Sequence, residues 1–180
     1  MTPGCCACTA TSASRCHRRA GWAVQVIATP AALDFFDQAA VEQQTGSPVK
    51  SQYSKPGAPR SQIPDAIVVA PATYNTINKW AQGISDTYAL GVLAEITGLD
   101  TPVVVLPVLP FVNSALASRA PFRRSVESLR GEGVRILLGA GGFEPHPPRT
   151  GGSLTSTYPW HLALDEAERL AGLRQGGMLR

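Results

Sequence analysis

Cysteine is missing from most of this chain. All four cysteines lie before residue 17, and residues 21–180 have none, unlike the spread cysteines of small disulfide-linked secreted proteins. The CCAC cluster at residues 5–8, followed by Cys16 and His17, raises the alternative of a zinc site. Tetrahedral zinc usually takes its second ligand pair from a separate turn, and no hydrophobic pattern fixes this stretch. We therefore predict no metal site and interpret residues 1–20 as an atypical, poorly ordered segment before one domain at residues 21–180.

Long apolar runs and strong charge are also missing. No run approaches the roughly 20 apolar residues that span a bilayer, and residues 1–20 lack the apolar core of a secretion signal. Charged residues make up 16% of the chain, with 16 Lys and Arg against 13 Asp and Glu. The arginines are scattered, so the small positive excess predicts a solvated surface. We expect a cytoplasmic protein that binds neither a membrane nor a nucleic acid.

Hydrophobic residues make up 44% of the sequence, enough for one sizeable core. Short apolar runs alternate with helical stretches, which indicates βαβ units. Strands are predicted at residues 22–29, 65–70, 103–106 and 134–138. Helices are predicted at residues 31–44, 74–97 (in two pieces around residues 83–85, with Asp86 capping the second), 121–130 and 158–173. The sequence thus predicts an α/β fold, a three-layer αβα sandwich with a parallel, Rossmann-like or flavodoxin-like sheet.

The opening strand and glycine-rich turn of such a sheet are not recognisable. Residues 1–20 contain small residues suited to a phosphate-binding turn, but no apolar strand precedes them. No G-x-G-x-x-G follows any predicted strand, which disfavours a dinucleotide site.

The strongest functional pattern follows the predicted strand at residues 65–70. Residues 71–86 read PATYNTINKWAQGISD, and ligands of parallel sheets bind beyond the carboxyl ends of the strands. Amides and short hydroxyls at the start of a helix suit an anionic or polar ligand. The alternative is that Thr73 and Asn75 only cap the helix, and spacing alone leaves both interpretations open.

This segment resembles the PASANT segment of the homo-oligomeric flavin-containing cysteine decarboxylases. That family includes phosphopantothenoylcysteine decarboxylase and the peptidyl-cysteine decarboxylases that modify lantibiotics. The matching residues are Pro71, Ala72, Asn75, Thr76, Gly83, Ile84 and Asp86. Residues 110–116, PFVNSAL, resemble the family's P-x-M-N-x-x-M motif, with Val and Leu in place of the methionines. Residues 26–36, VIATPAALDFF, resemble its second strand and the Thr-Pro turn that follows, and the order of all three segments agrees over about residues 21–138.

The resemblance implies a flavin site. It implies FMN bound between subunits of a homo-oligomer, a trimer or a multiple of it. By the matched motifs, the cofactor-binding candidates are Thr29, Ala72, Thr73, Asn75 and Thr76. Asn75 and Asn113 are the catalytic candidates, because the family uses these positions toward its substrate.

Two departures from the family concern catalysis. The family places a histidine between the helix after its second strand and the PASANT strand, and residues 38–64 contain none. Its substrate-holding downstream cysteine is also missing. We interpret His146, in the loop FEPHPP, as a surface histidine, with a loop that folds over the site as the alternative. His161, on the last predicted helix, is assigned ordinary surface or packing duty.

Two functions from different classes remain. One is an FMN-binding flavoprotein that acts as a lyase or oxidoreductase on an unidentified small substrate, which Asn75 and Asn113 favour. The other is a non-catalytic flavin-binding or regulatory interaction protein, as in the halotolerance-type phosphatase regulators that resemble this family. The missing histidine and cysteine favour that second function and argue against decarboxylation of phosphopantothenoylcysteine.

Overall fold

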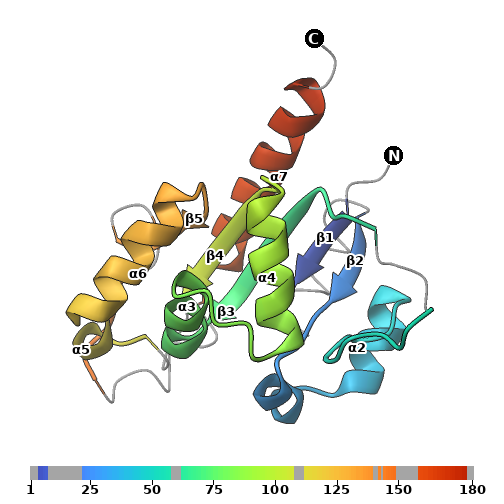
Figure 1. Cartoon of the computed structure of the whole chain (residues 1–180), viewed down its shortest axis with the longest axis horizontal. Helices are drawn as coiled ribbons and strands as arrows, with labels where there is room; N and C mark the ends of the chain where they lie inside the picture. The colour runs from blue at the N-terminus through green and yellow to red at the C-terminus, as the bar shows by residue number, and fades with distance from the viewer. Residues whose placement is uncertain are drawn as a thin grey trace.

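The chain forms one parallel β-sheet between two layers of helices. The computed structural model describes residues 4–7, 22–57, 62–107, 112–139, 142, 144–148 and 158–177. The strands, in the sheet order β2-β1-β3-β4-β5, are β2 Ala23–Val26, β1 Gly4–Ala7, β3 Ala66–Ala72, β4 Val103–Pro107 and β5 Arg135–Ile136 (Figure 1). The helices are η1 Pro30–Phe35, α2 Gln38–Thr45, α3 Tyr74–Ala81, α4 Tyr88–Gly98, α5 Ser114–Ala117, α6 Ala120–Gly131 and α7 Trp160–Gly177. All four strand pairs are parallel, so the predicted α/β fold with a parallel sheet is confirmed.

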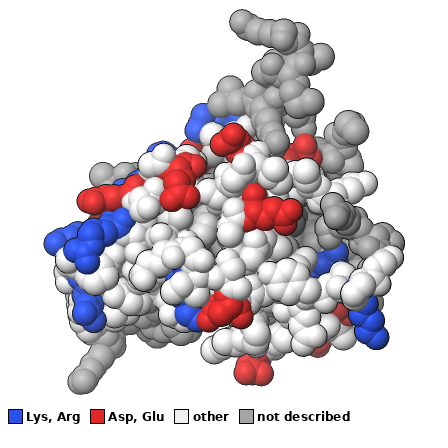
Figure 2. All heavy atoms as spheres, viewed as in Figure 1, with Lys and Arg blue, Asp and Glu red and all other residues white. Residues whose placement is uncertain are grey.

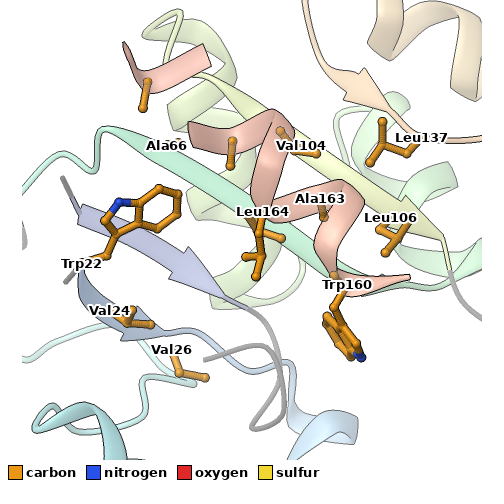
Figure 3. Packing of buried hydrophobic residues seen from close by; sticks show 14 of the residues in the cluster. Trp22, Val24, Val26, Ala66, Val104, Leu106, Leu137, Trp160, Ala163 and Leu164 are labelled. Carbon is orange, nitrogen blue, oxygen red and sulfur yellow. The ribbon is translucent and has the colours of Figure 1, made fainter. Parts of the chain in front are cut away.

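The two faces of the sheet carry separate apolar clusters. Side chains alternate between the faces of a strand, and in β3 Val68 packs into one cluster while Ile67 and Val69 pack into the other. The first cluster contains residues of α7, and Figure 3 shows Ala163 and Leu164 of that helix against the sheet. The second contains residues of α3, α4 and α6, which lie on the viewer's side of the sheet in Figure 1. This arrangement is the predicted three-layer sandwich.

The first strand corrects an expectation from the sequence. Gly4–Ala7 forms β1, which pairs with β2 on one side and with β3 on the other. The expected absence of a strand from residues 1–20 is therefore wrong. A four-residue strand of small residues gives almost no hydrophobic period, and its place comes from pairing with two longer apolar strands. Residues 8–20 and the cysteine side chains lie outside the described part, so the predicted disorder and the zinc alternative stay untested.

The predicted helix at residues 31–44 is two elements. Thr29 begins the 3₁₀ helix η1, whose ring-locked Pro30 suits a first turn, and Asp37 caps α2 by accepting a hydrogen bond from the Ala40 N–H (3.2 Å). The second Asx cap breaks the continuous helical pattern. Gly46 ends α2 in the left-handed conformation with φ 68°, where glycine carries no steric penalty.

The predicted break near residues 83–85 is confirmed, but its cap is different. Thr87, not Asp86, caps α4, since its hydroxyl accepts from the Leu90 N–H (3.3 Å). Asp86 instead pairs with Lys79 of α3. In the described part of the chain, no helix combines the length and the apolar character required to cross a membrane.

Candidate functional site

The strand order places a crevice at the carboxyl ends of β1 and β3. The chain leaves β1 toward β2 on one side, and β3 then lies on the other side of β1. In a doubly wound sheet the helices on the two sides of such a reversal diverge, and ligands bind where they do. The segment that follows β3 therefore begins beside this crevice. The segment that follows β1 lies outside the described residues.

Thr73 begins the polar segment after β3. The backbone at Thr73 is extended (φ −87°, ψ 159°), and its hydroxyl accepts from the Thr76 N–H at 3.1 Å. The two threonine hydroxyl oxygens lie 3.0 Å apart. Ala72 is fully buried at the end of β3, whereas Asn75 is exposed on the first turn of α3. Thr73 is thus a helix cap, as the first alternative held, and Asn75 is not its partner in that role.

The helix α3 is fixed from below by α6. Asn78 is buried, donates from its amide to the Tyr74 carbonyl (2.8 Å) and accepts from the Ser125 hydroxyl (2.8 Å). The rings of Tyr74 and Phe122 stack with centroids 5.3 Å apart, and Phe122 is fully buried. Packing and a satisfied polar pair together hold the first turn of α3 in place.

Thr29 lies at the end of β2, on the other side of β1. Its hydroxyl accepts from the Ala32 N–H at 3.3 Å and so starts η1. The side chain is half-buried. Thr29 and the Thr73 segment therefore flank the carboxyl end of β1 from opposite sides, as two of the three predicted segments require.

Asn113 follows β4 and meets a residue from far along the chain. Its carboxamide oxygen accepts from the Leu116 N–H (3.1 Å) and caps the four-residue helix α5. The next residue, Ser114, donates its N–H to the carbonyl of His146 at 2.8 Å. His146 is only 9% exposed, and its Nδ1 is buried without a hydrogen-bond partner among the described residues. The interpretation of His146 as a surface histidine is wrong, whereas His161 is exposed on α7.

Tyr158 is a residue of this region that the sequence did not single out. Its hydroxyl donates toward the carbonyls of Leu106 (2.7 Å) and Pro107 (3.1 Å), at the end of β4. Burial raises the pKa of the Tyr158 hydroxyl far above its ordinary value, so it stays a neutral donor. Only the fold joins it to β4, although its aromatic partner Trp160, at a centroid distance of 4.6 Å, lies close in sequence.

The assembled side chains are hydroxyls, amides and one imidazole. Residues 71–78 contain no acidic side chain, so nothing in that segment repels an anion. Such a set can hold a polar or anionic ligand by hydrogen bonds. Two surface depressions lie elsewhere, one beside the start of β4 around Thr101 and Val134, and one between β5 and α7 around Glu166. In the second, Arg169 lowers the pKa of the Glu166 carboxyl through hydrogen bonds, which marks a structural ion pair.

Comparison with known families decides which group of proteins shares this arrangement. The sequence profile of the family described as Flavoprotein matches residues 13–151, which is most of the chain. The chain belongs to the Flavoprotein family. The match starts before β2 and ends after β5, so it includes every described segment with a predicted site residue.

Solved structures share the fold of this Flavoprotein-family chain. HAL3 from Cryptococcus neoformans is 19% identical with a TM-score of 0.69, and 97% of each chain is covered. The FMN-dependent cysteine decarboxylase SpaF is 21% identical with a TM-score of 0.63, over 93% of this chain and 97% of its own. A PPC decarboxylase mutant complexed with pantothenoylaminoethenethiol is 19% identical with a TM-score of 0.61, over 87% and 96%. At these identities the likeness concerns the fold. No curated protein matches the sequence significantly.

Proposed function

We propose that this chain binds FMN at the carboxyl ends of β1 and β3. Membership of the Flavoprotein family carries the proposal, together with the position of the Thr73 segment beside the crevice of the sheet. The solved structures that share the fold include proteins named as FMN-dependent or FMN-binding. The crevice is where doubly wound folds hold their ligands.

The residues on the page fit such a group. Thr29, Ala72, Thr73, Asn75 and Thr76 would hold it, through two capped turns that flank β1. Ala72 adds no bulk at the end of β3, and the exposed amide of Asn75 is open to a polar atom of the ligand. When bound, FMN supplies redox chemistry, and the protein binds and orients the reacting molecules.

We propose a lyase or oxidoreductase activity on a small substrate that is not yet identified. Asn75 and Asn113 supply amide groups near the ends of β3 and β4, and each can orient a polar substrate atom. A non-catalytic flavin-binding or regulatory protein is the second candidate. The lack of histidine in residues 38–64 and the fold shared with HAL3 favour it.

Flavin binding is tested by spectroscopy. Purified protein is expected to show the visible absorption of flavin, and mass spectrometry of the released cofactor should give the mass of FMN. The protein freed of flavin should quench FMN fluorescence on titration, and Thr73→Val should weaken that binding. Gln82→Ala, an exposed change at the other end of α3, is the control and should bind FMN as the wild type does. A wild-type protein that neither retains nor rebinds FMN would contradict the proposal.

The substrate is tested by CO₂ release. We expect no decarboxylation of phosphopantothenoylcysteine at a useful rate, because a placed acid or base contributes about a hundred- to ten-thousand-fold and residues 38–64 lack a histidine. Glu42, in that range, already accepts from the Val49 N–H (2.8 Å) and the Gln38 amide (3.0 Å). These hydrogen bonds lower the pKa of the Glu42 carboxyl, which makes it a weaker base. Turnover of about one per second, an ordinary enzyme rate, would contradict the expectation.

We also propose a homo-oligomer, a trimer or a multiple of it, in the cytoplasm. The helix α4 supports this, since its exposed side is poor in charge: Figure 2 shows a largely uncharged surface over α3 and α4, whereas Lys and Arg gather over α6. A helix that is apolar around most of its girth needs more than one packing surface. Light scattering of the flavin-loaded protein should give a multiple of three 19.0 kDa chains, and a stable monomer at micromolar concentration would contradict it. Cell fractionation tests the compartment.

A further inference from the structure

His146 carries a feature that its surroundings do not explain. It is 91% buried, given its 9% exposure, and its Nδ1 lacks a hydrogen-bond partner among the described residues. Nearly all buried polar atoms in native proteins are paired, and the exceptions usually mark a functional role or a bound species that supplies the partner. A buried imidazole kept without such a role would lower stability relative to an apolar side chain.

The position of His146 adds a second observation. Its carbonyl accepts from the Ser114 N–H at 2.8 Å, which attaches the histidine loop to the start of α5, next to Asn113. Pro145, Pro147 and Pro148 surround it, and the fixed φ of proline restricts the freedom of such a loop. The histidine is therefore held beside a predicted site residue by a specific contact.

The hydrogen-bonding groups at this point define the ligand chemistry. The carboxamide oxygen of Asn113 is used by the Leu116 N–H, so its amide NH₂ is the part left to face a ligand. That group only donates, and an imidazole nitrogen also donates when it carries its hydrogen. Two neighbouring donors match an acceptor group, and a carboxylate accepts from both at once.

We propose that His146 is a ligand-binding residue of the flavoprotein site, which hydrogen-bonds through Nδ1 to a carboxylate of the small substrate beside Asn113. The inference rests on the proposed function, since it takes the end of β4 as part of the site. It assigns to residues 113 and 146 the selection of an acidic substrate over a neutral one of the same shape.

The test compares two probes that differ only in a carboxylate. N-acetylcysteine and N-acetylcysteamine are titrated by calorimetry into FMN-loaded wild type, His146→Leu, His146→Asn and the control His161→Leu, which changes an exposed histidine on α7. Wild type and the control should prefer N-acetylcysteine. His146→Leu should bind it about tenfold more weakly or worse, as expected for the loss of a hydrogen bond to a charged group, with N-acetylcysteamine unchanged. His146→Asn, whose amide can reach near the Nδ1 position, should bind N-acetylcysteine with intermediate affinity.

Two further readouts separate the explanations. FMN affinity, measured by fluorescence quenching, should stay equal in wild type and His146→Leu, so a wild type that fails to bind FMN contradicts the proposed function and is recognised separately. The thermal unfolding temperature of His146→Leu should be unchanged or higher, because an unpaired buried polar group is replaced by an apolar one. A lower unfolding temperature with an unchanged probe preference would show a structural role and overturn the proposal. Equal binding of the two probes by the wild type would also overturn it.

Discussion

The turn after β3 and the turn after β4 look alike in sequence but are built differently. Each follows an apolar strand and carries a side chain that caps the next helix, Thr73 for α3 and Asn113 for α5. The helix α3 has eight residues and packs on α6 through Asn78 and Phe122. The helix α5 has four residues, none of them buried, and a backbone hydrogen bond ties it to a distant loop. The first turn is supported by the core and the second by a loop.

This difference matters for a site that binds a ligand. Groups on rigid elements hold their geometry before the ligand arrives, which reduces the ordering cost of binding. Groups on loops open at lower free energy and can close on a ligand afterward. We infer that the turn after β3 serves the cofactor and the turn after β4 serves the exchangeable substrate, and the variants below test this assignment from the largest expected effect to the smallest.

Phe122→Ala should have the largest effect, on the support of α3. Phe122 is fully buried and stacks on Tyr74, and truncation of a buried phenylalanine lowers the free energy of unfolding by about 3–5 kcal/mol. Chemical denaturation followed by circular dichroism measures this loss. Phe35→Ala, at a ring that is 77% exposed, is the control and should change stability far less. A loss below about 1 kcal/mol for Phe122→Ala would mean that α3 is not supported by the core as described.

The same contrast explains what the sequence could predict. The strands β3 and β4 are continuous apolar runs, and their faces can be derived from alternation alone. The candidate residues Ala72, Thr73, Asn75 and Thr76 are neighbours in sequence, so a local pattern found them together. For this part of the site, fold and sequence carry the same information.

The rest of the region depends on contacts between distant residues. The burial of His146 follows from its attachment to Ser114, and the contact of Tyr158 with the end of β4 spans about fifty residues of sequence. Neither leaves a periodic signal. The strand β1 was missed for the same reason, because four small residues become a strand only between β2 and β3.

Ser125→Ala should have the second largest effect. It leaves the carboxamide oxygen of the buried Asn78 without its 2.8 Å donor, and an unsatisfied buried acceptor costs about 1–3 kcal/mol. The loss appears as a lower denaturation midpoint with an unchanged slope. Ser128→Ala, an exposed change on the same helix, should stay within about 0.5 kcal/mol of wild type. Equal stability of the two variants would contradict a polar support under α3.

The two caps should respond differently when each is replaced by alanine. Loss of a helix cap costs about 0.5–2 kcal/mol, and for Thr73→Ala we expect this in global unfolding because α3 is packed on α6. For Asn113→Ala we expect a smaller global loss, since a one-turn helix can open locally. Hydrogen exchange at the Ser114 amide, which donates to His146, should become faster in Asn113→Ala and not in Thr73→Ala. The reverse pattern would contradict the assignment of the rigid turn to β3.

Asn75→Ala should have the smallest effect on stability and still change function. Asn75 is exposed and is not the cap of α3, and alanine is the better helix former, so the free energy of unfolding should stay within about 0.5 kcal/mol of wild type. The variant loses a neutral hydrogen bond to the proposed FMN, worth about 0.5–1.5 kcal/mol, which corresponds to a dissociation constant higher by roughly two- to twelvefold. Fluorescence titration of flavin-free protein measures it, with Gln82→Ala as the matched exposed control on the same element. If Asn75→Ala keeps wild-type FMN affinity while Asn113→Ala weakens it, the cofactor lies at the turn after β4, and the comparison made above is reversed.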